Sequence, residues 1–155
     1  MAFTLTSPDF TDSGKIPVEY TCDGMGKSPA LLWSGEPEET KAFALVVHDP
    51  DAPSGDFTHW LLYNIPPDVH SLQEGPEPDH PGDDGKNTYD RIGWGAPCPP
   101  RGHGPHHYIF TLHAINTDEI TFHESGAGLA NIEAEIHGHI LATATLTGVF
   151  ERLEI

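Results

Sequence analysis

The sequence predicts an all-β fold with one amphipathic helix shortly before its C-terminal end. Its 16 glycines and 15 prolines cluster between short apolar segments, which is typical of strands joined by turns. No internal repeat is visible, and 155 residues suffice to bury one sizeable core. We therefore expect a single domain over residues 1–155.

Three segments are predicted to be strands, because β-branched and aromatic residues fill them and turn-forming residues bound them. They cover residues 43–47, 59–65 and 106–115. In the third segment, alternate residues from Tyr108 to Ala114 point to one face of the sheet, and His106 points the same way. That face should belong to the core, with His106 at its rim.

The rest of the chain divides into a long loop, a helix and a last strand. Residues 66–92 show no hydrophobic periodicity and contain five prolines, so we expect a 27-residue loop. Apolar residues at spacings of three and four predict a helix over residues 127–141, with Gly138 inside it at a cost of about 1 kcal/mol. The alternating sequence of residues 142–153, ATATLTGVFERL, predicts the closing strand.

The chain is strongly acidic, with a formal net charge of −17 from 24 acidic and 7 basic residues. Such a chain has no basic surface for nucleic acid or an anionic membrane, so neither is expected as a partner. No apolar run has the length of a signal peptide or a membrane span, and we expect a cytoplasmic protein, in which the acidity would suit high salt. Cys22 and Cys98 could pair with each other, but two cysteines are too few for a disulfide framework, and we expect free thiols.

Two polar clusters interrupt the apolar segments. Residues 48–60, HDPDAPSGDFTHW, bring aspartates and histidines into a short turn between two predicted strands. Residues 93–110, GWGAPCPPRGHGPHHYIF, are rich in proline and glycine, which can wall a ligand site without regular structure. An imidazole can donate to a phosphate oxygen, and an adjacent carboxylate can orient the ring and favour its charged form. Both clusters are therefore candidates for a binding site.

The clusters contain two longer motifs: DPDAP followed closely by HW, and GxPCPPxGxxxHHYIFTL. Through these motifs the sequence resembles the phosphatidylethanolamine-binding proteins, in their compact prokaryotic branch of Raf-kinase-inhibitor-like proteins. The segments YTCDGMGKSPALLW and IHGHILATATLTGVFERL extend the resemblance over nearly the whole chain. The resemblance implies an antiparallel β-sandwich with a pocket at one end for a small anion such as phosphate, phosphoethanolamine or acetate. It implies no cofactor, and it allows a homodimer and a kinase or protease as protein partner.

The resemblance assigns residues of both motifs to the pocket. In the first motif these are Asp49 and His59, while Asp51 either orients a ring as well or forms an Asx turn. A cis peptide bond between Ala52 and Pro53 is predicted in the same turn. In the second motif the pocket residues are Pro99, Pro100, His106 and Tyr108, together with the backbone amide of Cys98.

Other classes of function deserve comparison with a binding or regulatory module. An enzyme would need a nucleophile beside the histidines, and Ser54, Thr58 and Cys98 are candidates, but no sequence motif of a known catalytic class supports them. A zinc site could draw on the eleven histidines, although neighbours such as His106 and His107 point to opposite faces of a strand. Inhibition of a protease or kinase would use a surface loop such as residues 66–92.

Overall fold

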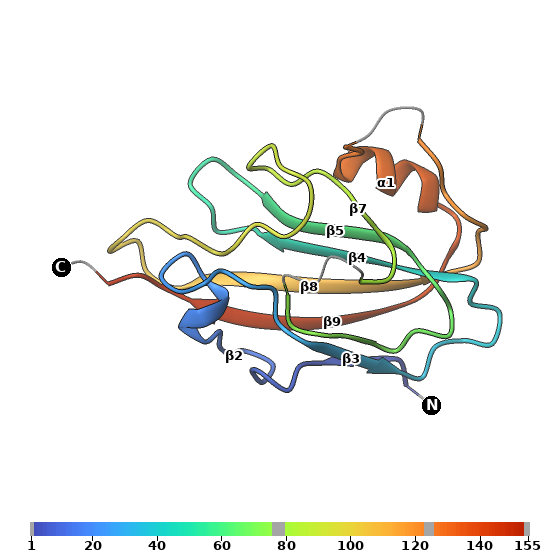
Figure 1. The fold of residues 1–155 in the computed structure, drawn as a ribbon, viewed down its shortest axis with the longest axis horizontal. Coiled ribbons are helices and arrows are strands. Elements are labelled where there is room, and N and C mark those ends of the chain that lie inside the picture. The colour runs from blue at the N-terminus through green and yellow to red at the C-terminus, as the bar shows by residue number, and fades with distance from the viewer. Residues whose placement is uncertain (1, 76–79, 123–125, 154–155) are drawn as a thin grey trace.

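The computed structural model describes residues 2–75, 80–122 and 126–153. Its strands are β1 (Thr4–Thr6), β2 (Gly14–Lys15), β3 (Leu31–Ser34), β4 (Ala42–Asp49), β5 (Phe57–Ile65), β6 (Ser71–Leu72), β7 (Asp83–Asp84), β8 (His106–Ile115) and β9 (Ile140–Phe150). They form a six-stranded sheet of order β2-β9-β8-β4-β5-β7 and a three-stranded sheet of order β1-β3-β6 (Figure 1). Every pairing is antiparallel except that of β2 with β9.

The main core lies between the two sheets, so the fold is the predicted β-sandwich. Trp33 of the small sheet packs edge-on against Phe43 of the large sheet, with 5.6 Å between the ring centroids. Alternate residues of β8 from His106 to Ala114 are all buried, which confirms the predicted inner face of this strand. His106 lies deeper than the predicted rim position, because only 1% of its surface is exposed.

The described residues contain one α-helix, α1 (Leu129–Ile136), which lies beside β5 on the outer face of the large sheet (Figure 1). Its Ile132 forms an apolar cluster with Val46 and Leu61. The helix is shorter than the predicted range of residues 127–141, because the chain leaves helical geometry at His137 and Gly138 adopts φ +82°. A left-handed glycine directly after the last turn is a common way for a helix to end. Gly138 therefore terminates the helix, and its predicted place inside the helix is wrong.

The other strand predictions differ from the structure mainly at their ends. The segment 59–65 extends back to Phe57 in β5, and the last strand covers Ile140–Phe150 rather than residues 142–153. The predicted loop over residues 66–92 contains two short strands, β6 and β7, which pair with β3 and β5. Two-residue strands carry no detectable periodicity, which explains why the sequence pattern did not reveal them.

Cys22 and Cys98 form a disulfide, so the prediction of free thiols is wrong. The bond joins the loop after residues 18–20 to the proline-rich segment before β8, 76 residues further along the chain. Two cysteines so far apart in sequence give no pattern from which a pairing can be read.

Among the helices of the described ranges, none has the length and apolar character that crossing a bilayer requires.

Candidate ligand-binding site

One end of the sandwich contains a cavity of about 180 Å³. It lies where the turn from β4 to β5 meets the segment that leads into β8, and these two connections gather at the same end of the molecule in Figure 1. An apolar cavity of about 150 Å³ can hold benzene, so this volume is sufficient for a small ion or headgroup. Seven of the eight predicted pocket residues line the cavity: Asp49, His59, Cys98, Pro99, Pro100, His106 and Tyr108.

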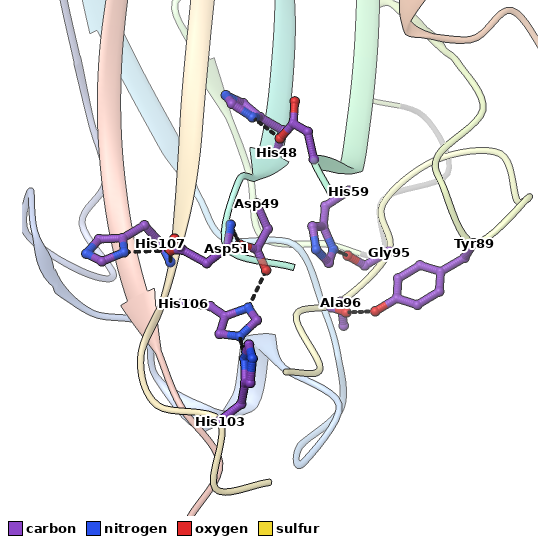
Figure 2. Close-up of polar contacts among 11 residues, drawn as sticks. His48, Asp49, Asp51, His59, Tyr89, Gly95, Ala96, His103, His106 and His107 are labelled. Carbon is purple, nitrogen blue, oxygen red and sulfur yellow. Dashed lines mark hydrogen bonds and ion pairs between the residues drawn. The ribbon is translucent and has the colours of Figure 1, made fainter. Parts of the chain in front are cut away.

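A chain of hydrogen bonds runs from the buried end of β4 to the surface (Figure 2). Nδ1 of His106 lies 2.6 Å from Oδ2 of Asp49, and both side chains are almost fully buried. A carboxylate can only accept, so Nδ1 of His106 carries a hydrogen. Nε2 of the same ring lies 2.6 Å from Nδ1 of His103, which belongs to the exposed loop before β8. His106 is thus held at both ring nitrogens.

His59, near the start of β5, is the second buried histidine of the cavity. Its Nδ1 lies 2.7 Å from the carbonyl oxygen of Gly95, so Nδ1 must donate. Burial lowers the pKa of His59, because loss of hydration outweighs the hydrogen bond to Gly95 and the charge of Asp49. The neutral ring with a hydrogen on Nδ1 has only a lone pair on Nε2. Nε2 can therefore accept from a ligand, and it can donate only after the ring gains a proton.

Aromatic rings form much of the cavity wall around His59. Phe57 and Tyr108 have ring centroids 4.7 and 5.2 Å from that of His59, and Tyr89 packs edge-on against Phe57. Burial raises the pKa of both tyrosines, so their hydroxyls stay protonated at neutral pH. The hydroxyl of Tyr89 donates to the carbonyl of Ala96. That of Tyr108 has no hydrogen-bond partner in the described part of the chain and is available to a ligand.

Asp51 is the one predicted pocket residue that does not line the cavity. Its carboxylate accepts from the backbone N–H of His107 and lies 2.8 Å from the ring Nδ1 of the same residue. This contact lowers the pKa of Asp51. The Asx-type contact in this turn is made by Asp49, whose Oδ1 accepts from the N–H of Asp51 at 2.8 Å. Asp51 therefore holds the outer side of the turn.

Cys98 lines the cavity, and its sulfur is covalently bonded to that of Cys22. A disulfide sulfur has no thiol proton to lose, so Cys98 in this state cannot be the thiolate nucleophile that the enzymatic alternative requires. Ser54 also lines the cavity, but within the described ranges no hydrogen bond joins a hydroxyl of Ser54 or Thr58 to a histidine. An activated nucleophile normally shows such a contact.

The cavity contains no lysine or arginine among the described residues that line it. Arg101 and Arg152 lie nearby in sequence or space, but both form ion pairs with Asp23. Positive charge inside the cavity would therefore have to come from protonated histidine. As for a metal, residues 2–75, 80–122 and 126–153 include no group of three or more His, Cys, Asp or Glu side chains arranged to hold an ion.

Several residues of the site were not assigned to it from the sequence, including the turn residues Ala52, Pro53 and Ser54, which line the cavity. Phe57 and Tyr89 line the cavity, and His103 contacts His106 although it was not assigned to the site. Phe57 lies within the first polar cluster, two residues before His59, so its place in the site could have been predicted from the sequence. Tyr89 comes from the long loop, where nothing local indicates which side chains turn toward the cavity.

The comparisons with known proteins agree with this architecture. The family model for phosphatidylethanolamine-binding protein matches residues 6–151. A UPF0098 protein of Aquifex aeolicus is 42% identical over 149 residues, which cover 94% of this chain and 86% of that protein. Two crystal structures are similar over 97% of this chain: a phosphatidylethanolamine-binding protein homologue of Chlamydia trachomatis, CT736, with 37% identity, a TM-score of 0.89 and 98% of its chain covered, and Escherichia coli YbcL, with 34% identity, a TM-score of 0.88 and 99% covered. The chain therefore belongs to the phosphatidylethanolamine-binding protein family.

Proposed function

We propose that this protein is a binding and regulatory module whose cavity takes a small anion such as phosphate, phosphoethanolamine or acetate. The observation that carries the proposal is the buried pair of Asp49 and His106, which lies in a cavity of about 180 Å³ beside His59 and the hydroxyl of Tyr108. Asp49 fixes Nδ1 of His106, so Nε2 is the nitrogen that would meet a ligand once its contact with His103 is broken. A regulated kinase or protease, the partner classes that the resemblance allows, would meet the rim of the cavity, where Tyr89 is 41% exposed.

The charge of the protein determines how an anion can bind. A net charge of −17 repels anions at long range, and no lysine or arginine is among the described lining residues. Attraction must therefore come from hydrogen bonds inside the cavity, to the Tyr108 hydroxyl and to protonated histidine. We accordingly propose that the anion binds together with a proton, which either comes from solvent or arrives on the ligand.

Titration calorimetry with inorganic phosphate at pH 6.5 tests this function. We expect the parent to bind and His106→Ala to lose about 1.5–3 kcal/mol of binding free energy, the usual contribution of a hydrogen bond to a charged group. His139→Ala is the matched control, because His139 is exposed and adjoins the start of β9, at the opposite end of the sheet from His106. Equal affinities of the parent and His106→Ala would contradict the proposed function.

A further inference from the structure

The ring nitrogen of His106 that would meet an anion is already occupied in this structure. Nδ1 of His106 faces Asp49, and its Nε2 is 2.6 Å from Nδ1 of His103 (Figure 2). The two rings are 4.9 Å apart between centroids, so the imidazole of His103 covers the edge of His106. His103 thus holds the place that a ligand oxygen would need at this nitrogen.

The contact between the two histidines requires one hydrogen and one lone pair. If Nδ1 of His103 donates, Nε2 of His106 is an acceptor and has no hydrogen for an anion. If Nε2 of His106 donates, its hydrogen is already used by His103. When both rings are protonated, both nitrogens carry hydrogens and the bond cannot form. The contact therefore competes with an anion in either tautomer and is lost on double protonation.

His103 stands in a loop that can let it move away. It is exposed, and it lies between Gly102 and Gly104, both of which have left-handed φ values, +74° and +92°. A Cβ atom at Gly104 would meet nothing within 4 Å, so the backbone beside His103 is not packed against other atoms. Two backbone hydrogen bonds hold the loop: the N–H of Gly102 donates to the carbonyl oxygen of Arg152, and the N–H of His103 donates to that of Pro100. Rotation of the His103 side chain needs neither bond to break.

The titratable groups around the two rings come from three strands, the turn after β4 and the loop after β7. Asp49 ends β4, His59 lies on β5, and Tyr108 stacks on His106 from within β8, with 6.5 Å between centroids. Asp51 and His107 pair with each other on the outer side of the turn, and Tyr89 reaches in from the loop after β7. Asp49 and Asp51 are thus the carboxylates nearest the pair, and His59 is the other buried imidazole of the cavity.

We propose that His103 is an internal cap on the anion-binding nitrogen of His106, which an incoming anion displaces and which protonation of both rings releases. The inference rests on the proposed function, since a cap matters only if this nitrogen binds an anion. In this proposal the loop residue His103 controls the affinity of the cavity for an anion. The cap weakens anion binding at high pH and no longer does so at low pH.

The test compares phosphate binding of the parent, His103→Ala and the exposed control His139→Ala by calorimetry from pH 5.5 to 8. At pH 8 we expect His103→Ala to bind about two- to tenfold more tightly than the parent, the factor that one neutral hydrogen bond contributes. The ratio of the two affinities should fall to one or below as the pH falls to 5.5. Because both proteins meet the same phosphate species, the ionisation of phosphate cancels from this ratio.

Nitrogen NMR of the ligand-free parent gives a second readout that does not depend on a ligand. A through-bond coupling between Nδ1 of His103 and Nε2 of His106 is expected at pH 8 and should vanish at pH 5.5. Absence of the coupling at pH 8 would overturn the cap, as would equal or weaker phosphate binding by His103→Ala at pH 8 when the parent binds. Binding by His103→Ala alone would support the cap. If no variant binds phosphate at any pH, the proposed function fails, and the cap fails with it.

Discussion

The ring of His59 has to gain a proton before its Nε2 can donate to a bound anion. Burial lowers the pKa of His59 in the empty cavity, and an anion at Nε2 would raise it. By linkage, affinity should be constant below the lowered pKa of the free protein and should fall as the pH rises through the raised pKa of the complex. Calorimetry with acetate from pH 5.5 to 8.5 measures this, since a carboxylic acid with a pKa of about 4 stays ionised throughout.

The variant His59→Gln separates this effect from the other titrating groups. A glutamine amide can still donate to the carbonyl of Gly95 and does not titrate. We expect its acetate affinity to be lower than that of the parent at pH 5.5 and to vary less with pH. A pH profile as steep as that of the parent would contradict the role of His59.

Tyr108 should contribute to the site through its hydroxyl alone. Burial raises its pKa, so the hydroxyl remains a neutral donor from pH 5.5 to 8.5. Tyr108→Phe keeps the ring that packs against His59 and removes only this donor, at an expected cost of about 0.5–1.5 kcal/mol in phosphate binding. The loss should be smaller than that of His106→Ala and the same at every pH. A loss that grows with pH would show that the hydroxyl acts through a histidine.

The residues of the site could be predicted to the extent that short motifs hold them together. Seven predicted residues line the cavity because the two motifs form the ends of neighbouring strands, β4, β5 and β8. The motif DPDAP does not indicate which of its two carboxylates points into the cavity. In the structure Asp51 pairs with His107 on the outer side of the turn. Nor could it predict His103, whose contact with His106 depends on how the glycine-flanked loop folds back.

At the level of secondary structure, strands were predicted more reliably than the end of the helix. Alternation of buried and exposed residues in β8 reports directly on the two faces of a sheet, and its predicted bounds match the structure. The helical spacing of apolar residues continues through Ile140, but that residue begins β9 and is 44% exposed. A spacing of three or four is compatible with a strand start after a turn, so the pattern alone could not end the helix at Ile136.

The variant Gly138→Ala tests where α1 ends. The predicted and the observed helix ends imply opposite changes in the free energy of unfolding. If Gly138 lay inside the helix, Gly138→Ala would stabilise the protein by about 1 kcal/mol. At φ +82° an added Cβ is strained, and we expect the free energy of unfolding to fall by about 1–2 kcal/mol. Urea unfolding measures the difference. The control Gly128→Ala adds the same methyl group at φ −92° and should cost less; a stabilised Gly138→Ala would contradict the observed helix end.

For the molecule as a whole, the disulfide joins two segments that are distant in sequence at the wall of the cavity. Because the bond spans 76 residues, replacing both cysteines by serine should lower the free energy of unfolding by about 2–4 kcal/mol. Anion binding should weaken too, since Cys98 and the two prolines after it line the cavity. Unfolding and phosphate titration with and without reductant measure both effects. Reductant should bring the stability and phosphate affinity of the parent close to those of the double variant, and it should not change those of the variant. If reductant changes neither property of the parent, the bond has no structural role.

The net charge of −17 should make the stability of the folded protein depend on salt. Carboxylates confined to a compact surface repel one another more than in the unfolded chain, and screening shortens from about 10 Å at 0.1 M salt to about 3 Å at 1 M. We expect the urea midpoint at pH 8 to rise with KCl concentration. Protonation of histidines makes the net charge less negative, so the rise should be smaller at pH 5.5. His106→Ala controls for chloride binding in the cavity: if it abolished the rise, the salt effect would belong to the anion site and not to the surface charge.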